Sequence, residues 1–191
     1  MGTITSSQND KTVLTSKQTA MLRANTRFTE QQIKDWHAGF LRDCPDGKLS
    51  KDRFMSVYEQ FYPGGKAKEF CKYAFATFDR DNNGTIDFIE FMLAIALTQT
   101  GDLEQRLTLA FDMYDINGSG SIDKSEMTRV ISAMYDLVGE TERKGERDPK
   151  HRASEIIKQF DVTGNKKLTK EEFIAGCKND PVIRRLLIPN A

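Results

Sequence analysis

The sequence predicts an all-α protein made of four helix–loop–helix units in two paired lobes. Helical periodicity is the first observation, because apolar residues recur at i, i+3, i+4 and i+7, which places them on one face of a helix. The second is a repeat along the chain, and the third is the lack of a long alternating Val/Ile-rich segment. Examples of the periodicity are Leu107/Ala110/Phe111/Tyr114 and Ala153/Ile156/Ile157/Phe160.

The repeat is marked by an aliphatic residue that is followed five positions later by a large apolar one. The four pairs are Leu49/Phe54, Ile86/Phe91, Ile122/Met127 and Leu168/Phe173. A fixed period indicates one supersecondary unit used several times, and we expect short strands through the aliphatic markers to bridge neighbouring loops. A charged insert at 139–150, with two glycines and Pro149, delays the fourth unit and is predicted to be a flexible linker.

We therefore divide the chain into an N-terminal arm at 1–25, a first pair of units at 26–98 and a second pair at 101–191. The 191 residues are 38% hydrophobic, which suffices for a proper core. Lys+Arg and Asp+Glu both number 28, and nucleic-acid binders usually carry a basic excess, so no nucleic-acid partner is expected. Three widely spaced cysteines, no secretory signal and no apolar run long enough for a bilayer indicate a reducing, intracellular compartment.

The loop at 79–90 carries oxygen-bearing side chains at the spacing that calcium requires. Calcium takes six to eight oxygens, and the EF-hand loop supplies them from positions 1, 3, 5, 7, 9 and 12, with a glycine at position 6 where φ is positive. Gly84 stands at that turn, and Asp87 is placed for a water-mediated contact. The predicted ligands are Asp79, Asp81, Asn83, Thr85 through its carbonyl, and Glu90.

The loop at 115–126 repeats the pattern with one carboxylate fewer. Gly120 makes the turn, and Asp123 stands at position 9. The predicted ligands are Asp115, Asn117, Ser119, Ser121 through its carbonyl, and Glu126. Two complete loops predict two bound Ca²⁺ ions.

The first loop, at 42–53, fails as a calcium site. Arg42 and Arg53 occupy positions 1 and 12, where anionic ligands are most important. Cys44 at position 3 is a soft ligand that calcium does not favour, and Pro45 stiffens the loop. We expect this loop to stay empty.

The fourth loop, at 161–172, is also expected not to bind. Asp161 and Glu172 are plausible ligands, together with Thr163 and Asn165. Lys166 replaces the turn glycine, however, which costs about 1–2 kcal/mol if a left-handed conformation is forced. Lys167 adds a second positive charge near the cation.

The chain begins Met1-Gly2-Thr3-Ile4-Thr5-Ser6, which fits the myristoylation pattern of Gly2 followed four residues later by Ser or Thr. An unmodified tail fits the motif alone equally well. Combined with an inactive first hand that contains Cys44-Pro45-Asp46-Gly47 and with intact second and third hands, it resembles the neuronal calcium sensor family. The resemblance runs from about Thr26 to Leu187, and the non-functional fourth hand is most similar to the recoverin/visinin branch.

The resemblance implies a calcium sensor that is N-myristoylated at Gly2 and exposes the acyl chain and an apolar groove on binding calcium. Such a protein is cytoplasmic and associates reversibly with the inner membrane surface. Its partner would be an amphipathic helix of a membrane-associated target: a receptor kinase in a recoverin-like protein, or otherwise a cyclase, channel or lipid kinase. Lys11, Lys17, Arg23 and Arg27 would either contact anionic lipid or form a solvated face.

The groove residues that the resemblance implies are aromatic or aliphatic, and each would serve equally well in an ordinary helical core. They are Phe28, Trp36, Phe40, Val57, Tyr58, Phe61, Tyr62, Phe88, Phe91 and Ile95. Two other functions stay open at this point, a cytosolic calcium buffer without a target and a calcineurin B-like regulatory subunit. No Ser/His/Asp, Cys/His or phosphate-binding glycine arrangement indicates an enzyme.

Overall fold

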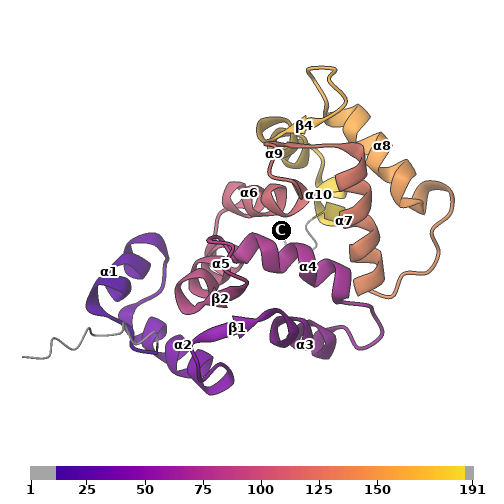
Figure 1. The fold of residues 1–191 in the computed structure, drawn as a ribbon. Helices are drawn as coiled ribbons and strands as arrows, with labels where there is room; N and C mark the ends of the chain where they lie inside the picture. The colour runs from indigo at the N-terminus through magenta and orange to yellow at the C-terminus, as the bar shows by residue number, and fades with distance from the viewer. Residues whose placement is uncertain (1–11, 188–191) are drawn as a thin grey trace, which may run out of the picture.

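A computed structural model describes residues 12–187 of the chain, and this part folds as two pairs of helix–loop–helix units (Figure 1). The predicted all-α class with short inter-loop strands is confirmed. The helices are α1 (Ser16–Asn25), α2 (Glu30–Asp43), α3 (Lys51–Phe61), α4 (Lys68–Phe78), α5 (Phe88–Thr100), α6 (Leu103–Tyr114), α7 (Lys124–Leu137), α8 (Pro149–Phe160), α9 (Lys170–Asn179) and α10 (Pro181–Leu187), with a 3₁₀ turn, η1 (Gly145–Arg147). The strands are β1 (Lys48–Ser50), β2 (Thr85–Asp87), β3 (Ser121–Ile122) and β4 (Leu168–Thr169).

The helix that leaves each of the last three loops starts at a reciprocal cap. At α5, the Glu90 N–H donates to the Asp87 carboxylate at 2.9 Å, and the Asp87 N–H donates back to the Glu90 carboxylate at 3.0 Å. The same capping box begins α7 and α9. Because these caps satisfy amides that have no partner inside the helix, positions 9 and 12 of each loop fix where its second helix begins.

The loops of each pair are joined by a short antiparallel ladder. In the first pair Leu49 lies opposite Ile86, and in the second Ile122 lies opposite Leu168. All four of these aliphatic markers are buried, which explains the repeat read from the sequence. The ladder therefore places the two loops of a pair side by side, and a shift in one backbone reaches the other directly.

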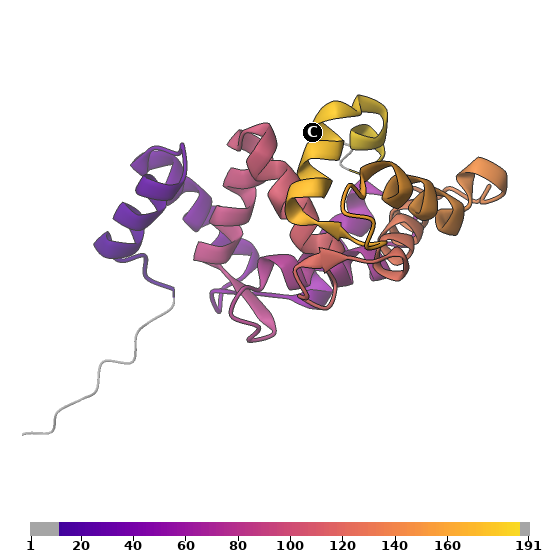
Figure 2. The ribbon, with the colours of Figure 1, turned by 90° about the horizontal axis from the view of Figure 1, so that it is seen from above.

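Each pair of units has its own hydrophobic cluster, and the two clusters interlock. Phe54 and Phe75 pack edge to face in the first cluster, with ring centroids 5.6 Å apart. In the second, Phe111 contacts Phe173 at 5.9 Å. Tyr73 of α4 belongs to the second cluster, so the first pair contributes a side chain to the core of the other. The ribbon of α4 runs close to the second pair of units (Figure 2).

The two pairs also meet backbone to backbone, at the α3–α4 connection and the end of α7. The Lys66 N–H donates to the Asp136 carbonyl at 2.7 Å. A Cβ added to Gly65 would stand 1.6 Å from the Leu137 carbonyl oxygen, and Gly139 lies against the Gly64 carbonyl. A side chain at position 65 cannot fit without moving one backbone away from the other.

The insert at 139–150 differs from the flexible linker that the sequence predicts. The Arg143 guanidinium donates to the Asp136 carboxylate at 2.6 Å and to the Ser132 hydroxyl at 3.2 Å. Asp148 caps α8, and Pro149 is the first residue of that helix, where no N–H is needed. Composition alone predicts mobility here, but these hydrogen bonds give the insert a defined path beside α7.

The glycine at position 65 gives a direct test of the contact between the two pairs. Gly65→Ala should lower the free energy of unfolding by about 1–3 kcal/mol, because the new methyl group overpacks against a backbone carbonyl. Urea unfolding in the presence of EDTA measures this without any contribution from calcium binding. Gly64→Ala is the matched control, because nothing lies within 4 Å of its added Cβ. Equal loss of stability in the two variants would contradict the contact.

Candidate calcium sites

The second loop gathers three carboxylates into a space suited to one ion. Ligand oxygens of Asp79, Asp81 and Glu90 all lie within 4.8 Å of one another. Two oxygens bound to the same Ca²⁺ at 2.3–2.6 Å are separated by at most about 5 Å. Asp79 and Glu90 are both buried, so an ion here would be held partly out of solvent.

Backbone amides of the loop hold these carboxylates in place. The Asp79 carboxylate accepts the Asn83 N–H at 3.0 Å and the Gly84 N–H at 2.9 Å. Gly84 has φ +85°, which is the left-handed turn that the sequence predicts at position 6. The Glu90 carboxylate accepts the Arg80 N–H at 2.9 Å, so the last residue of the loop reaches back across the loop to its second residue.

The third loop has the same internal hydrogen bonds with more neutral ligands. The Asp115 carboxylate accepts N–H groups from Ser119 at 2.9 Å and Gly120 at 2.7 Å. The buried Glu126 carboxylate accepts the Asn117 N–H at 3.1 Å. Asn117 and Ser119 stand where the second loop has Asp81 and Asn83, so the loop carries one negative charge fewer.

The fourth loop folds like the two predicted sites although it lacks the turn glycine. Lys166 adopts φ +63°, the strained conformation expected from the sequence, and donates its N–H to the Asp161 carboxylate at 2.7 Å. Glu172 is buried and accepts the Thr163 N–H at 2.9 Å. Desolvation raises the pKa of the Asp161 carboxyl, but the N–H groups of Lys166 and Gly164 outweigh it and hold that pKa below its usual value. Non-binding stays a prediction for this loop.

The first loop keeps the fold of the unit without the ligands. Gly47 has φ +71°, and the loop is held in register through β1. Arg42 and Arg53 are exposed at positions 1 and 12, and no carboxylate closes the loop. Cys44 at position 3 is buried, and desolvation raises the pKa of its thiol.

Four of the ten expected groove residues line one groove of about 740 Å³ between α2, α3 and α5. They are Trp36, Phe40, Val57 and Phe91. The Phe91 ring lies 5.9 Å from Trp36 and 5.3 Å from Phe40 between ring centroids. This aromatic wall stays partly open to solvent, because Trp36 and Phe91 are only half-buried.

The other six expected groove residues lie elsewhere or on the margin. Phe88 is buried against His37 and Phe40 and lines a separate cavity of about 450 Å³ beside α1. Tyr58 lines a separate cavity of about 360 Å³ between the two pairs of units. Phe61 is 76% exposed at the end of α3. Phe28, Tyr62 and Ile95 are half-buried and do not line the groove.

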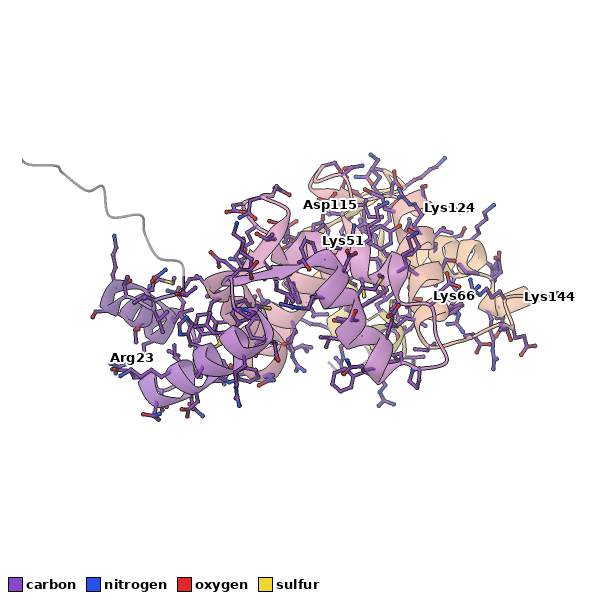
Figure 3. The ribbon with its side chains drawn as sticks, turned by 60° about the horizontal axis from the view of Figure 1, so that its bottom comes forward. Arg23, Lys51, Lys66, Asp115, Lys124 and Lys144 are labelled. Atoms are coloured by element: carbon purple, nitrogen blue, oxygen red, sulfur yellow. The ribbon has the colours of Figure 1, made fainter. Side chains whose placement is uncertain are left out.

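The N-terminal arm contains a helix that the sequence reading missed. Thr15 and Gln18 form a capping box at the start of α1, a signal that was present in the sequence. Leu22 is fully buried and fixes α1 to the first pair of units. Arg23 lies on α1 at the end of the molecule and pairs with Glu30 at 3.6 Å (Figure 3). Gly2 and Lys11 lie outside the described residues.

Comparison with known proteins agrees with the loop geometry. Two family models, both described as an EF-hand domain pair, match residues 45–94 and 104–178. The chain is 36% identical to S-modulin of Aquarana catesbeiana over 87% of its length and 84% of that protein. It is 35% identical to human recoverin over 87% of this chain and 85% of recoverin. With neuronal calcium sensor 1 of Lymnaea stagnalis it shares 39% identity over 87% of this chain and 88% of that protein.

The chain belongs to the neuronal calcium sensor family. Identity of this level over most of the chain confirms the resemblance that the loop motifs indicated. As a member of this EF-hand family the protein is a calcium-binding sensor and not an enzyme. Within residues 12–187, no helix has the length and apolar character needed to cross a membrane.

The closing glutamates allow the two sites to be tested one at a time. Glu90→Gln and Glu126→Gln should each remove one of two calcium ions, because each change deletes the anionic bidentate ligand and keeps its size. Isothermal calorimetry on the purified protein counts the sites.

Glu172→Gln is the matched control for this titration, because Glu172 makes the same hydrogen bonds in the fourth loop. It should leave the count at two. A wild-type count of three, falling to two in this control, would show that the fourth loop binds.

Proposed function

We propose that the protein binds two Ca²⁺ ions in its second and third loops and in response opens a groove for an amphipathic helix of a target protein. One observation carries this proposal: the closing ligand of the second loop and the aromatic wall of the groove are neighbours on one helix. Glu90 and Phe91 are adjacent in the first turn of α5. A movement that draws Glu90 toward an ion therefore moves Phe91 against α2.

The contacts of Phe91 explain how that movement reaches the groove. Its ring packs on Trp36 and Phe40, which both belong to α2. Sensor EF-hands change the angle between their helices when calcium binds, and α2 and α5 are the outer helices of the first pair. A change in the angle of α5 thus widens or narrows an aromatic channel of the kind that receives an amphipathic helix.

We further propose that Gly2 carries an N-myristoyl group and that the protein is cytoplasmic and associates reversibly with the inner membrane surface. One myristoyl chain gives only marginal membrane affinity, with an association constant of about 10⁴ M⁻¹, so calcium-dependent release of the chain can switch binding on and off. Lys17 lies exposed on α1, in the arm that leads to Gly2, and Arg27 lies exposed between α1 and α2. They are available to an anionic surface.

The target that fits this arrangement is a membrane-associated signalling protein with an amphipathic helix. Among receptor kinases, cyclases, channels and lipid kinases, we place receptor kinases first, because the chain is similar to recoverin and S-modulin over most of its length. A target held at the membrane meets the sensor only when the acyl chain is released. Membrane association and target binding would then both depend on the same two calcium ions.

Groove opening can be followed with an apolar fluorescent dye and with the single tryptophan, Trp36. Calcium should raise dye fluorescence several-fold and shift Trp36 emission in the wild type, because the aromatic wall becomes accessible. Glu90→Gln should remove most of both responses, while Glu172→Gln should keep them. A dye signal that ignores calcium would favour the second candidate function, a calcium buffer, since buffer EF-hands barely open.

Membrane association has its own test. Myristoylated protein should sediment with anionic vesicles when calcium is added and leave them when it is chelated. Gly2→Ala should abolish most of this, because each buried CH₂ contributes about 0.8 kcal/mol and the exposed basic residues act through a screened interface. Glu126→Gln should weaken the response by preventing full release of the chain. Equal sedimentation of the wild type with and without calcium would show a constant lipid anchor.

A further inference from the structure

The two arginines that disable the first loop face the groove. In the other three loops the residue at position 12 is a buried glutamate whose carboxylate accepts N–H groups of its own loop. In the first loop both anionic positions are replaced, and Arg42 and Arg53 are exposed. Both line the same groove as Trp36 and Val57.

The charges along the groove are unevenly placed. Asp35 lines it near the middle of α2, and Arg42 follows seven residues later on the same face, about 10 Å along the helix axis. Asp43 is the second acidic residue on this rim, and it offsets one of the two guanidiniums. The end of the groove at the first loop therefore keeps a net positive charge, while the end at Asp35 is negative.

These guanidiniums are not used in ion pairs within the part of the chain that the structure describes. The described salt bridges involve other cations. The Arg53 side chain lies near the Cys44 thiol, which is only a weak acceptor. Asp35 accepts the Gln31 side-chain amide at 2.9 Å, which leaves its charge in place. Arg42 and Arg53 thus remain available to an external carboxylate.

We propose that Arg42 and Arg53 receive acidic side chains from the last turn of the target helix, so that the helix binds with its C-terminal end at the first loop. This inference rests on the proposed function, because it supposes a helix in the groove. The C-terminal end of a helix carries a partial negative charge, and a guanidinium binds a carboxylate through two parallel hydrogen bonds. The reversed orientation would set the positive end of the helix against both arginines. Arg42 and Arg53, which prevent calcium binding in the first loop, thus set the direction in which the target helix lies in the groove.

Two synthetic peptides of equal length, with blocked termini and the same apolar stripe, test this polarity. One carries two glutamates in its last turn and two lysines in its first, and the other has these charges exchanged. Dissociation constants are measured by calorimetry in saturating calcium. Because the peptides differ in intrinsic helicity, the quantity compared is the ratio of their two constants in the wild type and in the variant Arg42→Glu/Arg53→Glu.

Reversing both charges should change that ratio by about tenfold or more in favour of the exchanged peptide, because each exposed ion pair changes affinity by up to about fivefold. The neutral variant Arg42→Gln/Arg53→Gln should give an intermediate ratio. Lys51→Glu is the control, since Lys51 is exposed at the start of α3 but does not line the groove (Figure 3). It should leave the ratio unchanged.

The possible failures separate the two proposals. If both peptides bind the wild type and the ratio is the same in all variants, the groove binds helices independently of these arginines. The inference is then overturned, while the proposed helix-binding function stands. If neither peptide binds in calcium although two ions are bound, the helix-binding function fails and the inference fails with it. Control and charge-reversed variants that shift the ratio equally would show a long-range charge effect, which also overturns it.

Discussion

The buried carboxylate at the end of each of the last three loops is the constraint on which the other features depend. A charged group taken out of water needs partners, and Glu90, Glu126 and Glu172 find them at both ends of their loops. Glu90, for example, accepts N–H groups from Arg80 and from Asp87. One side chain therefore closes the loop, caps the second helix and sets the angle between the two helices of the unit. An ion that binds the same oxygens therefore affects the loop closure, the helix cap and the interhelical angle together.

Much of the fold and of the calcium sites could be predicted because their determinants are local. Each loop is specified within twelve residues, and the strand register follows from Leu49, Ile86, Ile122 and Leu168, whose burial the repeat anticipates. Helix starts follow from capping residues a few positions apart. The capping box of α1 was equally visible, and weighting it would have placed that helix in advance.

The parts that could not be predicted depend on which side chains meet in the folded molecule. Phe88 and Phe91 are three residues apart on α5, yet one is buried against His37 and the other lines the groove. Periodicity places both on an apolar helix without saying which neighbour each will meet. The ordered path of the insert, likewise, depends on Arg143 reaching the Asp136 carboxylate, a pairing that composition does not reveal.

The backbone contact between Lys66 and Asp136 makes α7 a lever arm. This helix starts beside Glu126 in the third loop and has 14 residues, so it is about 21 Å long. A tilt of about ten degrees at the calcium end displaces the far end by roughly 3–4 Å, which exceeds the length of a hydrogen bond. The far end is held to the connection that leads into α4. As long as that bond holds, α4 must move with α7, so a tilt that begins at the third loop would be transmitted mechanically to the half of the molecule that carries the groove.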